Sequence, residues 1–274
     1  LLEHVGVRPS AALGYSLGET ASMFALGVWR DRDAMLRRLS DSDLFTRDLA
    51  GPCRAAARHW QLPAGEPARW QSGVIDRPAE EVRRAVARHA RTYLQIINTP
   101  NECVIGGEPR AVEALVRDLG AQFFPVPGVT TVHAPVLGEV ESAYRALHRF
   151  PVHVPAGIDV YSPAGGAPYA LTTESIAASI TTQGLDGFDY VRCIETAYQN
   201  GARIFIETGP GSSCTRMVGA ILGSRPHRTL SLERAREPIE LSLARIAATL
   251  SAERAEIDLD RVIGSPHREE TIDL

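Results

Sequence analysis

The chain has 274 residues, of which 44% are apolar, and its formal net charge at pH 7 is −4. This length allows one large domain or two small ones, and the apolar content is enough to form a sizeable core. The scattered basic residues argue against a nucleic-acid surface, and no apolar run approaches the roughly 18 residues that span a bilayer.

The four cysteines are far apart in the sequence and form no C-x-x-C pair. This usage is typical of free thiols in a reducing cytoplasm, and it argues against a disulfide framework or a zinc site. We therefore expect a cytoplasmic protein with no metal site and no membrane insertion.

The first 71 residues are predicted to contain a short strand over 9–13, a tight turn, and helices over 19–39 and 48–60. The first helix is expected to break near Gly27. The predicted secondary structure changes over residues 72–131, where strands and helices follow in the order β-α-β-β-α-β. This order predicts a ferredoxin-like subdomain inserted in a larger domain.

Strands alternating with helices resume over residues 132–250 and predict a parallel sheet covered on both faces. We expect residues 1–71 and 132–250 to form one α/β core around the insert. Residues 251–274 are charged and turn-rich, so they are predicted to form a linker or tail.

Gly14-Tyr15-Ser16-Leu17-Gly18 matches G-x-S-x-G between a predicted strand and a predicted helix. Strand, sharp turn and helix are the context that a nucleophile elbow requires, with the serine lifted to the helix N-terminus. The pattern also fits a glycine-flanked turn in which Ser16 only caps the helix.

A serine nucleophile needs a base, and His133 is the best candidate. It lies between apolar residues and precedes Ala-Pro, at the point where the insert is expected to return to the core. A hydrogen-bonded structural histidine remains the alternative. Surface or capping roles are expected for the other seven: His4, His59, His89, His148, His153, His227 and His267.

Four stretches, in order, resemble the acyltransferase domains of polyketide synthases, polyunsaturated fatty acid synthases and bacterial malonyl transferases. They are the G-Y-S-L-G-E elbow, N-T-P with V-I-G-G at 98–107, H-A-P at 133–135 and E-T-G-P-G at 207–211, and Gln183 matches a further Q-L motif. The resemblance implies an α/β-hydrolase-like core with a ferredoxin-like insert. It also implies that Tyr15 and Asn98 line the substrate pocket.

The resemblance further implies ping-pong acyl transfer from acyl-CoA to the phosphopantetheine thiol of an acyl carrier protein, with no cofactor bound by the domain. Ser16 would be the nucleophile and His133 the base. The Leu17 amide would form part of the oxyanion hole, and a carbonyl near Gln183 would orient the histidine. Other domains of a larger synthase are the expected partners.

The chain departs from the family pattern at three places. Tyr15 stands where a histidine is usual, and the arginine expected about 25 residues after Ser16 is missing, with Arg38 and Arg47 the nearest. No G-Q-G-x-Q segment precedes the elbow, so we expect the core to be incomplete at its N-terminus. Two other functions stay open: a serine esterase or thioesterase with Asp159 or Asp189 as its acid, and a non-catalytic docking domain of a megasynthase.

Overall fold

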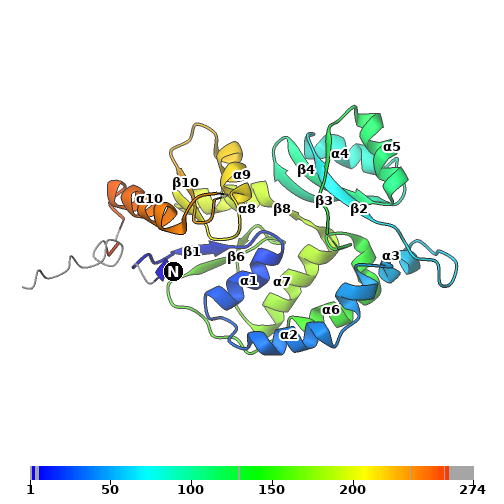
Figure 1. The fold of residues 1–274 in the computed structure, drawn as a ribbon, viewed down its shortest axis with the longest axis horizontal. Coiled ribbons are helices and arrows are strands. Elements are labelled where there is room, and N and C mark those ends of the chain that lie inside the picture. The colour runs from blue at the N-terminus through cyan, green and yellow to red at the C-terminus, as the bar shows by residue number, and fades with distance from the viewer. Residues whose placement is uncertain (1, 4–5, 129, 235, 256, 259–274) are drawn as a thin grey trace, which may run out of the picture. The chain divides into compact units, whose positions relative to one another are not determined.

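The computed structural model describes the chain except residues 1, 4–5, 129, 235, 256 and 259–274 (Figure 1). His4, His267 and most of the expected tail therefore lie outside the described residues. The chain divides into two compact units. The larger contains residues 11–202 and 220–223, and the smaller contains residues up to 10, 203–219 and those from 224 onward.

In the larger unit, the G-x-S-x-G turn directly follows a strand that belongs to a short parallel pair. Strand β1 (Ala11–Leu13) pairs with β6 (Asp159–Ser162), with Ala12 opposite Val160. Strand β7 (Ala167–Pro168) adds to β6 in the antiparallel sense, and Pro168 has no N–H with which to extend the ladder. The described strands form three sheets. Strands outside the segment expected to be inserted are divided among them, where one parallel sheet was expected.

Helices surround this strand pair and bury one apolar cluster, which includes Met23, Trp29 and Ile176. Helix α1 ends where predicted, because Gly27 adopts a φ of 69° that favours glycine. Helix α7 ends at Asp186, before Gly187. The helices are α1 (Leu17–Ala25), α2 (Arg32–Ser40), α3 (Arg54–His59), α6 (Glu141–Leu147), α7 (Thr173–Asp186) and α8 (Tyr190–Gln199), with a short π-helix at Leu44–Asp48 and a 3₁₀ helix at Pro135–Val140.

The segment expected to be inserted forms most of a five-stranded sheet with the order β5-β2-β4-β3-β8. Its first four strands are antiparallel neighbours, and two helices bury Val82 and Leu115 against them. Strand β8 (Phe188–Asp189) joins β3 in parallel from far along the chain, which the sequence did not indicate. The other elements are β2 (Gln71–Ile75), α4 (Ala79–Val86), β3 (Thr92–Thr99), β4 (Glu102–Gly107), α5 (Pro109–Leu119) and β5 (Phe123–Pro125).

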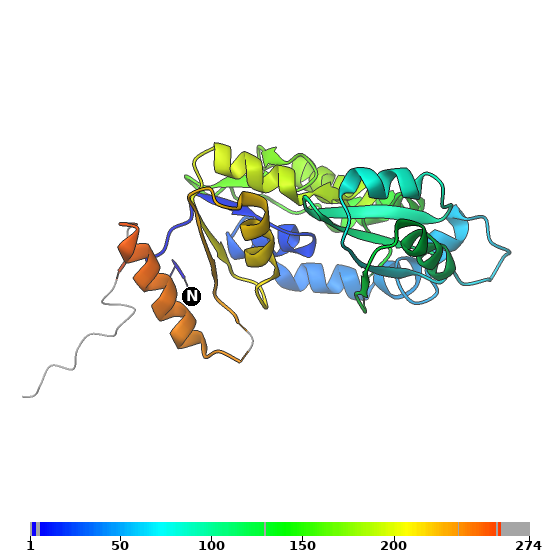
Figure 2. The same ribbon diagram turned by 90° about the horizontal axis from the view of Figure 1, so that it is seen from above.

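In the smaller unit, β9 (Ile204–Glu207) and β10 (Arg228–Ser231) run side by side in parallel (Figure 2). Helix α10 (Ile239–Ala252) packs Ile246 and Leu250 into an apolar cluster with Leu232. The acid of the E-T-G-P-G motif caps helix α9 (Ser213–Leu222): a Glu207 oxygen accepts from the Thr215 amide at 2.7 Å. Within the described residues, no helix combines the length and apolar character needed to cross a membrane.

Candidate active site

Ser16 lies at the turn between β1 and α1, with φ 52° and ψ −117°. A positive φ is strained for a residue with a Cβ, and such strain is typical of functional turns. Gly14 makes the turn possible, because a Cβ there would lie 2.1 Å from the Glu19 backbone nitrogen. A Cβ at Gly18 would meet nothing within 4 Å, so only the first glycine of the motif is required by close approach.

The side chains of Ser16 and His133, 117 positions apart, meet in the structure. Ser16 Oγ lies 2.7 Å from His133 Nε2, and His133 Nδ1 lies 2.8 Å from the Gln183 carbonyl oxygen. Because a carbonyl only accepts, Nδ1 carries the proton and Nε2 is left as the acceptor for the serine hydroxyl. This tautomer is the one that a general base for Ser16 needs.

The imidazole of His133 is buried, with 7% of the residue exposed. Burial lowers its pKa to about 4, opposed by the hydrogen bond to the Gln183 carbonyl. The ring is therefore neutral at pH 7 and able to accept a proton. The ring of Phe188 meets it edge-on, with centroids 5.4 Å apart.

Leu17 is the first residue of α1, so its amide is one of the helix N–H groups that have no intrahelical acceptor. Among the described residues, no acceptor is found for it. It lies next to Ser16 at the positive end of the helix dipole, where developing negative charge is favoured.

Tyr15 and Asn98 are joined to each other. The Tyr15 hydroxyl donates to Asn98 Oδ1 at 2.7 Å, and Asn98 Nδ2 donates to Glu102 Oε1 at 2.9 Å. The ring of Tyr15 also meets Phe188 and Tyr190 edge-on. Tyr15 therefore bridges the elbow to β3, and its hydroxyl is already committed to a protein acceptor.

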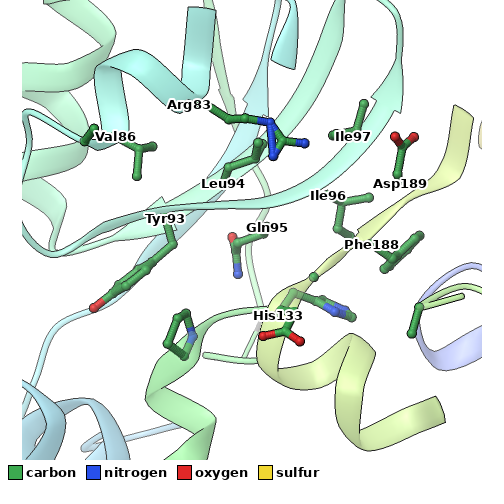
Figure 3. A pocket seen from close by; sticks show the side chains of 15 residues that line it. Arg83, Val86, Tyr93, Leu94, Gln95, Ile96, Ile97, His133, Phe188 and Asp189 are labelled. Carbon is green, nitrogen blue, oxygen red and sulfur yellow. The ribbon is translucent and has the colours of Figure 1, made fainter. Parts of the chain in front are cut away.

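A cavity of about 550 Å³ opens beside His133 (Figure 3). Its wall includes Arg83 from α4, Gln95 from β3 and Phe188 from β8, with apolar side chains between them. Of the six residues predicted for the site, His133 alone lines this cavity. Gln95 has a buried side-chain oxygen that lacks a hydrogen-bond partner among the described residues.

The acids and arginines considered from the sequence do not contact His133. Asp189 caps α8 by accepting from the Arg192 amide, and Asp159 is exposed at the start of β6. Arg38 donates to two backbone carbonyls and lies 4.0 Å above the Phe150 ring. Arg47 pairs with Asp43.

The sequence reasoning missed the role of Glu19, which is fully buried on α1. Its carboxylate accepts from Tyr169, Ser179 and Gln183. Burial raises its pKa to about 7. The available signal was an acid in the first turn of an otherwise uncharged helix, directly after the elbow. His148, for which a surface or capping role was expected, is the C-cap residue of α6; it is buried, and its Nδ1 donates to the Tyr144 carbonyl at 2.8 Å.

No family model matches the sequence. Among solved structures, the acyltransferase domain from the second module of the salinomycin polyketide synthase matches with a TM-score of 0.76 and 20% identity. That match covers 100% of this chain and 61% of that one. The chain has the fold of an acyltransferase domain. The malonyl CoA-acyl carrier protein transacylase of Clostridium perfringens shares it, with a TM-score of 0.68 and 20% identity over 92% of this chain and 75% of that one.

Among curated proteins, one of the polyunsaturated fatty acid synthase polypeptides of Thraustochytrium sp. is 24% identical over 267 residues. The match covers 91% of this chain but 13% of that polypeptide, so the chain corresponds to a small part of its relative. These findings confirm the resemblance to the acyltransferase domains of polyketide and polyunsaturated fatty acid synthases that the sequence motifs indicated.

Proposed function

We propose that this acyltransferase-fold chain moves an acyl group from acyl-CoA to the phosphopantetheine thiol of an acyl carrier protein through an acyl-Ser16 intermediate. The observation that carries the proposal is the Ser16 Oγ to His133 Nε2 contact of 2.7 Å at a strained turn. The C. perfringens protein that shares this fold is a malonyl CoA-acyl carrier protein transacylase, which supports this choice of substrates.

In the first half-reaction, Ser16 Oγ attacks the thioester carbonyl carbon while His133 Nε2 takes the hydroxyl proton. A C–O bond forms, and the carbonyl oxygen takes up the negative charge. The Leu17 amide and the N-terminus of α1 stabilise this oxyanion. When the intermediate collapses, the C–S bond breaks and the imidazolium returns its proton to the departing CoA thiolate.

The second half-reaction runs the same steps with the carrier-protein thiol as the nucleophile. His133 takes the thiol proton, sulfur attacks the acyl-Ser16 carbonyl, and the Ser16 oxygen leaves with the proton. Gln183 assists in both half-reactions, because its backbone carbonyl accepts from His133 Nδ1–H and stabilises the imidazolium that forms in each.

A more detailed assignment of the two parts of the fold also supports the acyltransferase function. We assign the strand pair and helices around Ser16 to an α/β-hydrolase-like core, and residues 72–131 to a ferredoxin-like subdomain. The support for the second assignment is the antiparallel order β5-β2-β4-β3, which places the fourth strand of the segment beside its first and the third beside its second. The small share of its relatives that the chain covers supports an association with other synthase domains.

Water competes with the carrier thiol for acyl-Ser16, so the partition between them defines the reaction class. The test uses the full-length protein, a panel of acyl-CoA thioesters and a phosphopantetheinylated carrier protein. Acyl carrier protein should form faster than free acid, and a Ser16→Ala variant should form none. Rapid release of free acid with no acyl carrier protein would instead identify a serine hydrolase, and unchanged product from the Ser16→Ala synthase would identify a docking domain.

A further inference from the structure

Glu19 is a carboxyl group in the interior of the larger unit, with 0% of the residue exposed. Its Oε1 accepts from the hydroxyls of Ser179 at 2.6 Å and Tyr169 at 3.0 Å, and its Oε2 accepts from the Gln183 side-chain amide. No cation compensates it among the described residues. A buried carboxyl without a cation is costly, so its presence calls for a specific explanation.

The partner Gln183 makes two contacts with different parts of the site. Its side chain donates to Glu19 on α1, and its backbone carbonyl accepts from His133 Nδ1 at 2.8 Å. Glu19 is itself three residues after Ser16, whose Oγ contacts His133 Nε2. Ser16, Glu19, Gln183 and His133 are therefore linked in a ring of contacts that connects the turn at Ser16, α7 and the imidazole.

We propose that Glu19 is a positioning residue for His133, acting through Gln183, and that its protonation state sets the reactivity of Ser16. The inference rests on the proposed function in one respect, namely that Ser16 is the nucleophile and His133 its base. An ionised Glu19 holds the Gln183 amide by a charge-assisted hydrogen bond and favours the imidazolium that forms during attack.

Other titratable groups around Glu19 stay neutral in this range. Tyr144 on α6, Tyr169 and Cys193 on α8 face it, and burial raises the pKa of each well above 7. The pKa of Glu19 is about 7, and the His133 pKa is about 4. The two groups therefore titrate in separate pH windows, and a change in reactivity near pH 7 belongs to Glu19.

Gln183 can serve both protonation states of Glu19. Its side-chain oxygen is buried and has no partner within the described part of the chain. When Glu19 is protonated, a half-turn of the Gln183 amide would let the carboxyl O–H donate to that oxygen. Reactivity at Ser16 should thus fall below pH 7 without loss of the fold.

The test is the rate at which a fluorophosphonate labels Ser16 in the full-length protein between pH 5 and 9, a readout that needs no knowledge of the acyl donor. The wild-type rate should rise through an inflection near pH 7. Glu19→Gln should remove the inflection, because the amide keeps a donor and an acceptor but does not ionise. Tyr169→Phe should move it to higher pH, because the lost hydrogen bond lowers the Glu19 pKa in the wild type.

Glu19→Ala should lower the maximal labelling rate at least tenfold at every pH, with little change in the half-saturating probe concentration. Thr181→Val is the matched control: it removes a buried hydrogen bond on α7, donated to the Ala177 carbonyl, that involves neither Glu19 nor its partners, and it should change neither rate nor inflection. An inflection retained in Glu19→Gln and unmoved in Tyr169→Phe would overturn the inference, even if Glu19→Ala fails to fold. Absence of any label on wild-type Ser16 would overturn the proposed function as well.

Discussion

The two glycines of the elbow should respond in opposite ways to the same substitution. In Gly14→Ala, the new Cβ would lie 2.1 Å from the Glu19 nitrogen and 2.2 Å from the Gly18 carbonyl carbon, where ordinary contacts begin at 3.4 Å. The start of α1 must therefore move by at least about 1 Å, and Ser16 moves with it. A misplacement of about 1 Å costs on the order of 10²-fold in rate.

The same crowding should also destabilise the unit by about 1–3 kcal/mol, which lowers Tm by roughly 2–12 °C at this size. Gly18→Ala meets open space within a helix. It should keep the wild-type rate and gain roughly 0.5–1 kcal/mol from the better helix propensity of alanine. Fluorophosphonate labelling of Ser16 and thermal unfolding measure both effects. A Gly14→Ala variant with wild-type Tm and labelling rate would refute the close-approach argument.

Three further predictions follow from the site. Ser16→Ala and His133→Gln should each lower the acyl-transfer rate by several orders of magnitude. Because the two residues act as a unit, the double variant should be no slower than the slower single variant. Additive losses in the single-turnover rates would contradict this. Burial lowers the pKa of both His133 and His148 to about 4, so each contributes stability above pH 6.5 that is lost as the pH falls to 4, by up to roughly 3 kcal/mol. His148→Gln should therefore flatten the acid limb of urea-unfolding free energies, and an unchanged limb would count against that assignment. Arg38→Met should lower Tm but leave the ratio of malonyl to acetyl transfer unchanged, because the Arg38 side chain contacts backbone carbonyls and the Phe150 ring. A changed ratio would instead show that Arg38 binds the substrate.

The nucleophile and the base could be predicted because each belongs to a short motif with a local physical signature. Ser16 lies between glycines at the start of a helix, and His133 lies between apolar residues before Ala-Pro. Glu19 could not be assigned a role in this way. Its partners Ser179 and Gln183 are at least 160 positions away, and only the packing of α7 against α1 shows that its face of the helix is buried.

The fold, too, could be predicted where an element is defined by its local sequence, and not where it is defined by contacts with distant residues. The order of strands and helices over residues 72–131 was predicted from the sequence, and β2, α4, β3, β4, α5 and β5 follow it. Strand β8 was missed because two residues carry no periodicity, and it is defined only by its pairing with Ile96 and Ile97 on β3. The expectation of one parallel sheet outside residues 72–131 was wrong for the same reason, since the sequence pattern of a strand does not reveal which strand it pairs with.

The central claim is that an acyl group resides on the Ser16 oxygen between donor and acceptor. Intact-mass analysis and peptide mapping after brief mixing of the full-length protein with acyl-CoA test it most directly. The account predicts one added acyl mass on the peptide that contains Ser16, lost on addition of carrier protein and absent from Ser16→Ala. Acyl transfer to the carrier protein with no acylated Ser16 peptide at any mixing time would contradict it.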